Sequence, residues 1–345
     1  MNYSKIKKLV QKLKKNKKKL GLCHGVFDVL HYGHIKHFEA AKKQCDILFV
    51  SVTEDRFIKK GINRPIHSHD ERSHFLKKLN MIDYVFFACP SYALRQTCMD
   101  SANWDQYSWQ LKGAIALCKG LETESNLFAH EVMSQEMGQS IATGYLTGPS
   151  HAHDIAIGKP GAMSLALNLD QEELNELRDS ISSSSLRVYS TNDLVGAALG
   201  SCLKNVYAIA TGISDGLGFG DNARAALLTR SMNEMITLGC KLGGRQETFF
   251  GLSGFGDLIG TCMGEWSRNR NFGLKIASGE SPLDAKMSQI TVVEGYGATK
   301  CFHEKCRDLQ IEMPILNEIF GILYQGKKPN VALRDLMERE LKDER

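Results

Sequence analysis

The chain has 345 residues, which is enough to bury a substantial core and to form two domains. Apolar residues make up 43% and charged residues 24%, as in ordinary soluble globular proteins. The formal charge of +4 is mild and mostly local, because residues 1–20 hold nine lysines and no acid. Such a basic arm could contact nucleic acid or anionic lipid. We favour a solvated amphipathic helix without nucleic-acid binding, because its apolar residues share one helical face: Ile6, Leu9, Val10 and Leu13.

The ten cysteines lie far apart and include no C-x-x-C pair. In a long chain without a secretory signal, this spacing is typical of reduced thiols in a cytoplasm. No apolar run approaches the roughly 20 residues that are needed to span a bilayer. We therefore expect a soluble, cytoplasmic protein.

Short apolar runs alternate with helical stretches in the first part of the chain. The predicted strands are Leu20–Val26, Ile47–Val52, Tyr84–Ala88, Ala114–Leu117, Ile141–Leu146, Leu165–Leu167 and Leu186–Tyr189. Helices are predicted at about His34–Lys43 and His69–Leu79, between the first three strands. This alternation predicts an α/β domain over residues 1–190, with a doubly wound, Rossmann-like parallel sheet.

The pattern changes to helix after Asn192. Long stretches rich in Ala, Leu and Val are predicted to form helices at Asp193–Ile213 and Ala223–Leu238. Glycine clusters at Gly212–Gly220 and Gly251–Gly256 separate the helical segments. We therefore expect residues 191–345 to form an all-α C-terminal domain.

The first predicted strand leads into a turn that contains His31, Gly33 and His34, directly before a helix. A helix N-terminus at the carboxyl end of a parallel strand presents free N–H groups and a partial positive charge. The imidazoles add donors, and Gly33 lets a phosphate approach the backbone closely. The pattern therefore predicts a nucleotide phosphate site. The spacing of His31, His34 and His37 also permits a metal site, but we do not expect a metal there.

Further segments accompany this turn, over about residues 5–87. They are the lysine-rich lead helix, the strand Ile47–Val52, Thr53-Glu54-Asp55, and the stretch from Arg64-Pro65-Ile66 to Asp70-Glu71-Arg72. Together they resemble the HxGH nucleotidyltransferases, in particular glycerol-phosphate cytidylyltransferases and the nucleotidyltransferase half of ADP-heptose synthases. The resemblance implies that His31 and His34 stabilise the phosphates of CTP, bound with Mg, and that Lys42 is a further phosphate contact. Those families also carry a serine/threonine segment that is missing after Phe87, so a structural relic without transferase activity is the alternative.

Another set of motifs begins at Tyr84 and runs to about residue 330. They are Phe86–Ala93, Cys118–Glu122, Thr147–Ala152, Lys204–Val206, Gly220–Arg224, Gly254–Leu258, Ser267–Asn271 and Val292–Tyr296. Their order and spacing resemble those of bacterial NAD-dependent glycerol-3-phosphate dehydrogenases. This resemblance implies glycerol 3-phosphate or dihydroxyacetone phosphate as the substrate and NAD or NADP as the cofactor. It also implies a helical domain of the 6-phosphogluconate dehydrogenase C-terminal type.

Lys204 interrupts an otherwise apolar helix, where an ammonium group is costly unless it has a partner. Burial would lower its pKa toward neutrality, which suits a proton donor and acceptor. By resemblance, Lys204 is the catalytic acid/base at the C2 oxygen, together with Asp257. Taken alone, Lys204 could instead extend to solvent, and Arg268 could be a surface charge.

The resemblance also assigns the binding residues. Lys119 and Asn205 would hold the catalytic groups and the substrate hydroxyls, and Ser267, Arg268 and Asn269 suit a phosphate dianion. Gly148 and Ser150 would also line this substrate pocket. The residues that would face the dinucleotide are Ala152, Arg268, Val292 and Glu294.

Dehydrogenases of this type begin with a G-x-G-x-x-G turn, which this chain lacks. We expect the nucleotidyltransferase-like half, residues 1–84, to replace that element, with the junction in the strand Tyr84–Ala88. Both halves would then share one sheet with the strand order 3-2-1-4-5-6, because about 60 residues are too few to close a core alone. The strand end that normally reads the ribose lies in this half, so the sequence does not separate NAD from NADP.

Three functions remain open. We rank first an oxidoreductase that interconverts glycerol 3-phosphate and dihydroxyacetone phosphate with NAD(P), because Lys204, Asp257 and Glu294 are all present. A CTP:glycerol-3-phosphate cytidylyltransferase that uses the His31–His34 turn comes second, and a non-catalytic sensor of glycerol phosphate comes third. Parent dehydrogenases are commonly dimers, so a homodimer is one candidate by analogy, and the sequence leaves the oligomeric state open.

Overall fold

The computed structural model describes residues 19–28, 32–53, 55, 65–77, 83–100, 111–289, 292–341 and 343. The lysine-rich lead helix and His31 therefore lie outside the described residues. The chain folds into two compact units. Unit 1 comprises residues 1–118, 128–146 and 150–194, and unit 2 comprises residues 119–127, 147–149 and 195–345. The expected domain boundary at residue 190 thus lies close to the main division, but two short segments cross over to unit 2.

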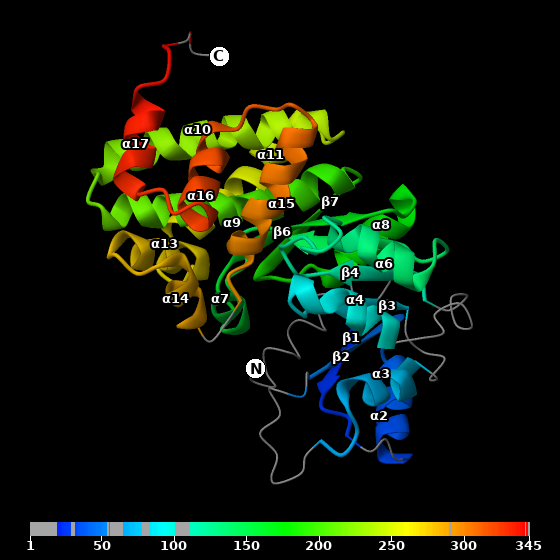
Figure 1. The fold of residues 1–345 in the computed structure, drawn as a ribbon. Helices are drawn as coiled ribbons and strands as arrows, with labels where there is room; N and C mark the ends of the chain where they lie inside the picture. Colours follow the sequence, from blue (N-terminus) through cyan, green and yellow to red (C-terminus); the bar gives the residue numbers. More distant parts are fainter. Residues whose placement is uncertain are drawn as a thin grey trace. The chain divides into compact units, whose positions relative to one another are not determined.

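Unit 1 is built on a seven-stranded sheet (Figure 1). Its strands are β1 (Leu20–Gly25), β2 (Ile47–Val52), β3 (Tyr84–Phe87), β4 (Gly113–Ala116), β5 (Ala142–Thr147), β6 (Gly161–Leu167) and β7 (Leu186–Thr191). The pairs β1–β2, β2–β3, β3–β4, β4–β5 and β6–β7 are parallel. Every predicted strand is present, and β1 and β2 belong to the same sheet as the others.

The strand order corrects the prediction. The order is β1-β2-β3-β4-β5-β6-β7, and not 3-2-1-4-5-6. Phe49 of β2 pairs with Tyr84 of β3, so β2 lies between β1 and β3, and β1 is left at the edge of the sheet. Leu22 of β1 is accordingly 67% exposed. The predicted order came from family resemblance, whereas apolar periodicity specifies where strands occur and not which strands pair.

The helices of unit 1 are α2 (Tyr32–Lys42), α3 (His69–Lys77), α4 (Ser91–Asp100), α6 (Ala129–Met137), α7 (Ala152–Ala156) and α8 (Gln171–Ile181). Helix α2 contacts β1 and β2, α6 contacts β4, and α8 contacts β7. Two apolar clusters result. One contains Phe38 of α2 with Cys23 and Leu48 of the first two strands. The other contains Leu174 and Leu177 of α8 with residues of β3 to β7.

Unit 2 consists mainly of helices (Figure 1). They are α9 (Leu194–Gly216), α10 (Gly220–Lys241), α11 (Gln246–Phe250), the π-helix η2 (Leu252–Gly256), α12 (Asp257–Met263), α13 (Arg268–Ala277), α14 (Pro282–Met287), α15 (Glu294–Asp308), α16 (Pro314–Tyr324) and α17 (Pro329–Met337). Helix α9 is buried along almost its whole length. It packs closely on α13, because a Cβ atom at Gly212 would lie 2.0 Å from the backbone oxygen of Arg270.

Helix α9 lies close to its predicted bounds, Asp193–Ile213, and ends three residues later. Among the described helices it is the one with the length and composition to cross a membrane, but 89% of its most apolar stretch is buried within the fold. Such burial is typical of the core helix of a globular unit. All ten cysteines are free in this structure.

Candidate active site

One buried carboxylate in unit 2 joins two lysines. Asp257 is 1% exposed, and its Oδ2 accepts a hydrogen bond of 2.7 Å from Nζ of Lys119. Its Oδ1 accepts a hydrogen bond from Nζ of Lys204, whose side chain is 5% exposed. A buried ammonium needs such a partner, so the alternative that Lys204 extends to solvent does not hold.

Glycines explain how Asp257 comes so close to α9. The π-turn of η2 requires Gly254, because a Cβ atom there would lie 2.1 Å from the backbone oxygen of Phe249. Gly200 lies on α9, one turn before Lys204, and packs against the backbone of Ser253. A Cβ atom at Gly200 would lie 2.4 Å from the backbone oxygen of Ser253. Single π-turns are frequent at functional sites. Here the turn ends at Asp257, the first residue of α12.

Lys119 belongs to unit 2 although it directly follows β4. Residues 119–127 and 147–149 were expected in the first domain, but both segments pack with the helices. The Lys119 ammonium donates to the backbone oxygen of Gly148 at 2.8 Å as well as to Asp257. These bonds to polar groups of unit 2 account for the change of unit. Lys119, Gly148 and Asp257 therefore lie together, as the resemblance implied.

The environment of Lys204 shifts its pKa. The pKa of Lys204 is lowered to about 7, mainly by burial and also by the nearby Lys119 charge, while Asp257 opposes the shift. The hydroxyl of Thr261 also accepts a hydrogen bond of 2.8 Å from Nζ of Lys204. The sequence analysis missed Thr261, which lies four residues after Asp257 on α12, so that the two side chains share one face of the helix.

An amide chain connects this cluster to the start of α13. Nδ2 of Asn205 donates to the backbone oxygen of Lys119 at 2.7 Å, and Oδ1 of Asn205 accepts from Nδ2 of Asn269 at 2.9 Å. Oδ1 of Asn269 in turn accepts from the backbone N–H of Gly295 at 2.9 Å. A side chain at Gly295 would collide with the backbone oxygen of Asn205, so glycine is required there. The predicted residues of α9 and α13 are thus brought together.

Arg268 is the first residue of α13, and its side chain is exposed. The guanidinium makes no ion pair within the part of the chain that the structure describes. The first turn of α13 contains no acid, so its free N–H groups and Arg268 can hold a phosphate dianion. Ser267 directly precedes Arg268 and is the N-cap residue of α13. It is 1% exposed and caps α13 by accepting from the N–H of Arg270.

The other predicted dinucleotide contacts are divided between the units. Glu294 is the first residue of α15 in unit 2, and its charge contributes to raising the pKa of Cys202 on α9, so it faces the helix that carries Lys204. Val292 is half-buried just before it. Ala152 begins α7 in unit 1. Ser150, which was predicted for the substrate pocket, also belongs to unit 1.

The turn between β1 and α2 provides a second candidate site. Gly33 is exposed in the first turn of α2, and His34 packs edge-on against Phe27, with their ring centroids 5.6 Å apart. Lys42 is not a phosphate contact here. It lies in the last turn of α2, and its ammonium donates to Asp83 at 2.9 Å. Because α2 has 11 residues, Lys42 lies about 15 Å along the helix axis from the N-terminus.

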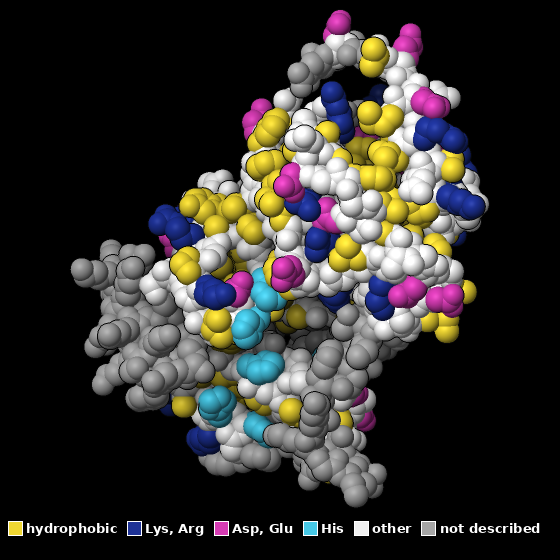
Figure 2. Space-filling model, turned by 90° about the vertical axis from the view of Figure 1, so that its left-hand side faces the viewer, with side chains coloured by type: hydrophobic (Ala, Val, Ile, Leu, Met, Phe, Trp, Pro, Cys, Tyr) yellow, Lys and Arg dark blue, Asp and Glu magenta, His cyan; other side chains and the backbone are white. Residues whose placement is uncertain are grey.

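Histidine side chains gather on one face of the molecule in Figure 2. All described histidines except His303 belong to unit 1. The rings of His151 and His153 lie 6.1 Å apart. Across the described residues, however, no three His, Cys, Asp or Glu side chains are grouped so that they could hold a metal ion.

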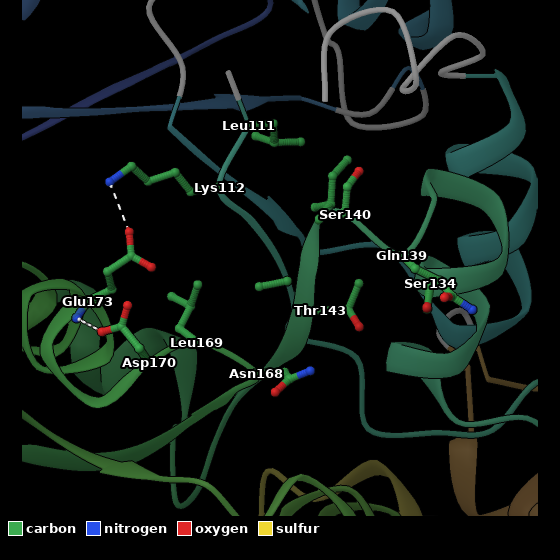
Figure 3. A pocket seen from close by; sticks show the side chains of 12 residues that line it. Leu111, Lys112, Ser134, Gln139, Ser140, Thr143, Asn168, Leu169, Asp170 and Glu173 are labelled. Atoms are coloured by element: carbon green, nitrogen blue, oxygen red, sulfur yellow. Dashed lines mark hydrogen bonds and ion pairs between the residues drawn. The ribbon is translucent and has the colours of Figure 1, made fainter. Parts of the chain in front are cut away.

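A separate cavity of ≈ 630 Å³ in unit 1 is shown in Figure 3. It lies at the amino ends of β4 and β5 and beside the start of α8, where Lys112 pairs with Glu173 at 3.3 Å. The carboxyl ends of β4 and β5 lead instead to Lys119 and Gly148. None of the predicted site residues lines this cavity.

Comparisons with known proteins identify the family of the chain. Residues 193–334 match the family model of the NAD-dependent glycerol-3-phosphate dehydrogenase C-terminus, and residues 33–173 match that of the N-terminus. A glycerol-3-phosphate dehydrogenase [NAD(P)+] of Janthinobacterium sp. (strain Marseille) is 41% identical over 237 residues, which are 68% of this chain and 71% of that protein. One of Clostridium botulinum is 36% identical over 305 residues, covering 88% of this chain and 89% of that protein.

Solved structures of glycerol-3-phosphate dehydrogenases have a fold similar to that of this chain. The crystal structure of glycerol-3-phosphate dehydrogenase from Coxiella burnetii has a TM-score of 0.72 and 29% identity, and the match covers 93% of this chain and 99% of that one. A glycerol-3-phosphate dehydrogenase of Plasmodium falciparum shares the fold, with a TM-score of 0.74 and 17% identity over 96% of this chain and 99% of that one.

These matches correct the expected junction. The dehydrogenase match begins at residue 33 and not near Tyr84, and the nucleotidyltransferase resemblance receives no support from the comparisons. The two families share a strand-helix-strand pattern here, so the His31–His34 turn did not distinguish them. The chain belongs to the NAD-dependent glycerol-3-phosphate dehydrogenase family.

Proposed function

We propose that the chain interconverts sn-glycerol 3-phosphate and dihydroxyacetone phosphate with NAD or NADP. One observation carries this proposal: the Lys119–Asp257–Lys204 cluster is joined through Asn205 and Asn269 to the N-terminus of α13, which bears Arg268. This arrangement offers a proton donor and acceptor close to a phosphate site. The names of the relatives and the family match support the same substrate.

Lys204 acts on the C2 oxygen. With a pKa lowered to about 7 by burial, both of its protonation states are populated at neutral pH. Neutral Lys204 accepts the proton of the C2 hydroxyl during oxidation, and the ammonium form returns it to the carbonyl oxygen during reduction. Asp257 and Thr261 fix the position of Nζ, and the less buried Lys119 adds positive charge beside the developing oxyanion.

The substrate phosphate is held at the start of α13. Its free N–H groups and the guanidinium of Arg268 supply a partial and a full positive charge. Asn269 ties this turn to Asn205, which directly follows Lys204 in the chain. The amide link sets the spacing between the phosphate and the C2 oxygen, and a three-carbon phosphoester matches two such neighbouring subsites.

The residues present fit a dinucleotide. In unit 1, α2 begins beyond the carboxyl end of β1 with no acid in its first turn, so its N–H groups can donate hydrogen bonds to a diphosphate. In unit 2, Val292, Glu294 and Arg268 are the residues that the family resemblance predicts for the dinucleotide. When bound, the nicotinamide accepts or supplies the hydride at C2. We place the reaction in the cytoplasm, in keeping with the ten free cysteines.

A ligand panel followed by a rate assay tests the proposal. We expect NADH or NADPH and glycerol 3-phosphate each to raise the melting temperature, because each binds the native state. We also expect reduction of dihydroxyacetone phosphate when the nicotinamide absorbance is followed. Stabilisation by CTP, without stabilisation by either dinucleotide and without turnover, would contradict the proposed function and favour nucleotidyl transfer.

A further inference from the structure

Arg72 of α3 is the most deeply buried cation among the described residues, with 0% of its surface exposed. Its guanidinium donates to three backbone oxygens, those of Val26 at 2.5 Å, Thr53 at 2.9 Å and His67 at 3.0 Å. It also pairs with the carboxylate of Asp55. Fully buried arginine is rare unless it is paired, and here four of its five N–H donors are used.

Two of these acceptors lie at the carboxyl ends of neighbouring strands. Val26 directly follows β1, and Thr53 directly follows β2, its parallel neighbour. The N–H of Thr53 also donates to the oxygen of Gly25 at 3.0 Å. Ligands of α/β proteins bind at the carboxyl ends of parallel strands. Carbonyl oxygens left free at these strand ends would present negative partial charge to a phosphate, and the carboxylate of Asp55 would present a full negative charge. The guanidinium of Arg72 neutralises the carboxylate and binds the carbonyl oxygens.

The residues that follow Val26 are held as well. Phe27 adopts a φ of 49°, unusual for a residue with a side chain, and its buried ring lies 5.1 Å from that of Phe38 on α2. The carboxylate of Asp28 accepts from the N–H of Ile66 at 2.9 Å and from that of His67 at 3.1 Å. Each residue from 26 to 28 is therefore fixed by a different contact, before the chain reaches α2.

We propose that Arg72 is a positioning residue for the diphosphate of the dinucleotide. The chain has no G-x-G-x-x-G motif after β1, so the glycines of that motif do not shape the backbone there. Arg72 instead binds the carbonyl oxygens of Val26 and Thr53, so that these oxygens do not face the phosphates and the N–H groups at the start of α2 can donate to them. Arg72 does not touch the ligand, because it is fully buried. This inference rests on the proposed function.

The decisive variant is Arg72→Lys, which keeps the charge but cannot reach four acceptors at once. We expect the Kd for NADH or NADPH, from nicotinamide fluorescence without substrate, to rise about tenfold or more. The KM for glycerol 3-phosphate, which binds to unit 2, should stay within about twofold of the wild-type value. The matched control is Arg95→Lys on α4, which loses contacts to Gln135 and Glu136 and should keep the wild-type Kd.

Two results would overturn the inference: an unchanged dinucleotide Kd in folded Arg72→Lys, or an equal loss of dinucleotide and substrate affinity. If Arg72→Lys does not fold, hydrogen exchange of the wild type decides. NADH should protect the peptide that spans residues 20–42, and protection confined to other peptides would contradict the role of this turn. An active wild type with either negative result would refute only the inference, whereas a wild type that binds no dinucleotide would refute the proposed function as well.

Discussion

In unit 2, the buried ammonium of Lys204 contacts a carboxylate and a hydroxyl, whereas in unit 1 the buried guanidinium of Arg72 contacts mainly backbone carbonyls. Burial lowers the pKa of Lys204 to about 7, so this group can exchange protons at neutral pH. An arginine stays charged under the same conditions. The titratable Lys204 thus suits proton transfer, whereas the permanently charged Arg72 suits the positioning of backbone groups at the ends of β1 and β2.

The largest effect is expected for Lys204→Met, which keeps much of the side-chain volume in α9 but removes the acid/base group. We expect kcat to fall by about 10²- to 10⁴-fold, while the dinucleotide Kd stays unchanged. Steady-state assays and fluorescence titration measure the two quantities. Lys112→Met is the control, because this lysine is 49% exposed and pairs with Glu173, away from the Lys204 cluster. Wild-type turnover in Lys204→Met would remove this residue from the mechanism.

Arg268→Lys should have the next largest effect, because lysine cannot form a paired contact with two phosphate oxygens. We expect the KM for glycerol 3-phosphate to rise about tenfold or more, with a smaller change in kcat. Inhibition by inorganic phosphate should weaken in parallel. The matched control, Arg230→Lys on α10, alters an exposed arginine and should change neither value. Unchanged substrate and phosphate affinity would place the phosphate elsewhere.

Thr261→Val should shift a pH profile more than it lowers the maximal rate. Its hydroxyl accepts from the ammonium of Lys204, so it favours the charged form. Its removal should lower the apparent pKa of Lys204 by about one unit, which corresponds to about 1.4 kcal/mol. Thr261→Ser should restore the wild-type profile. If Thr261→Val kept that profile too, the hydroxyl would have no influence on the proton of Lys204.

The smallest effect on activity is expected at Glu234 of α10. Its carboxylate accepts from the N–H groups of Ile315 and Leu316 at the start of α16 and from the hydroxyl of Tyr207. Burial raises the pKa of Glu234 from 4.5 to about 7, although these bonds oppose the rise. The folded state therefore binds this proton more tightly than the unfolded chain does. Its contribution to stability is full below pH 4.5 and is lost as the pH rises toward 7.

Glu234→Gln should flatten this dependence. Over the same interval the wild type should lose about 3 kcal/mol of unfolding free energy through this group. Urea unfolding at several pH values measures the difference between the two proteins. Parallel stability curves for the wild type and Glu234→Gln would show that Glu234 does not titrate in this range.

The sequence predicted the elements better than their arrangement. The seven strands and helices α9 and α10 follow from apolar runs and lie near their predicted bounds. Lys204 was identifiable because a charge inside an apolar helix needs a partner. The strand order was wrong, since β2 pairs with β3 through backbone groups that carry no side-chain signature. Lys42 is excluded from the predicted phosphate site at the start of α2, because it lies in the last turn of that helix.

Long-range contacts explain the other differences. Lys119 follows a strand of unit 1 but belongs to unit 2, where it bonds to Asp257, Gly148 and Asn205, which are all distant in the sequence. The role of Arg72 could not be read from residues 70–72, because its acceptors lie 19 and 46 positions away in the chain. Thr261 could have been identified from the sequence, because it lies four residues after Asp257, the spacing that places two side chains on one face of a helix.

The central claim, that the Lys204 cluster moves the substrate proton, is tested most directly by the pH dependence of kcat in both directions. With saturating substrates, kcat reports groups in the enzyme–substrate complex. Oxidation of glycerol 3-phosphate needs neutral Lys204, so its kcat should rise with pH through about 7. Reduction of dihydroxyacetone phosphate needs the ammonium form and should fall over the same range. Profiles that are flat from pH 6 to about 8, or that change in the same direction, would contradict the account.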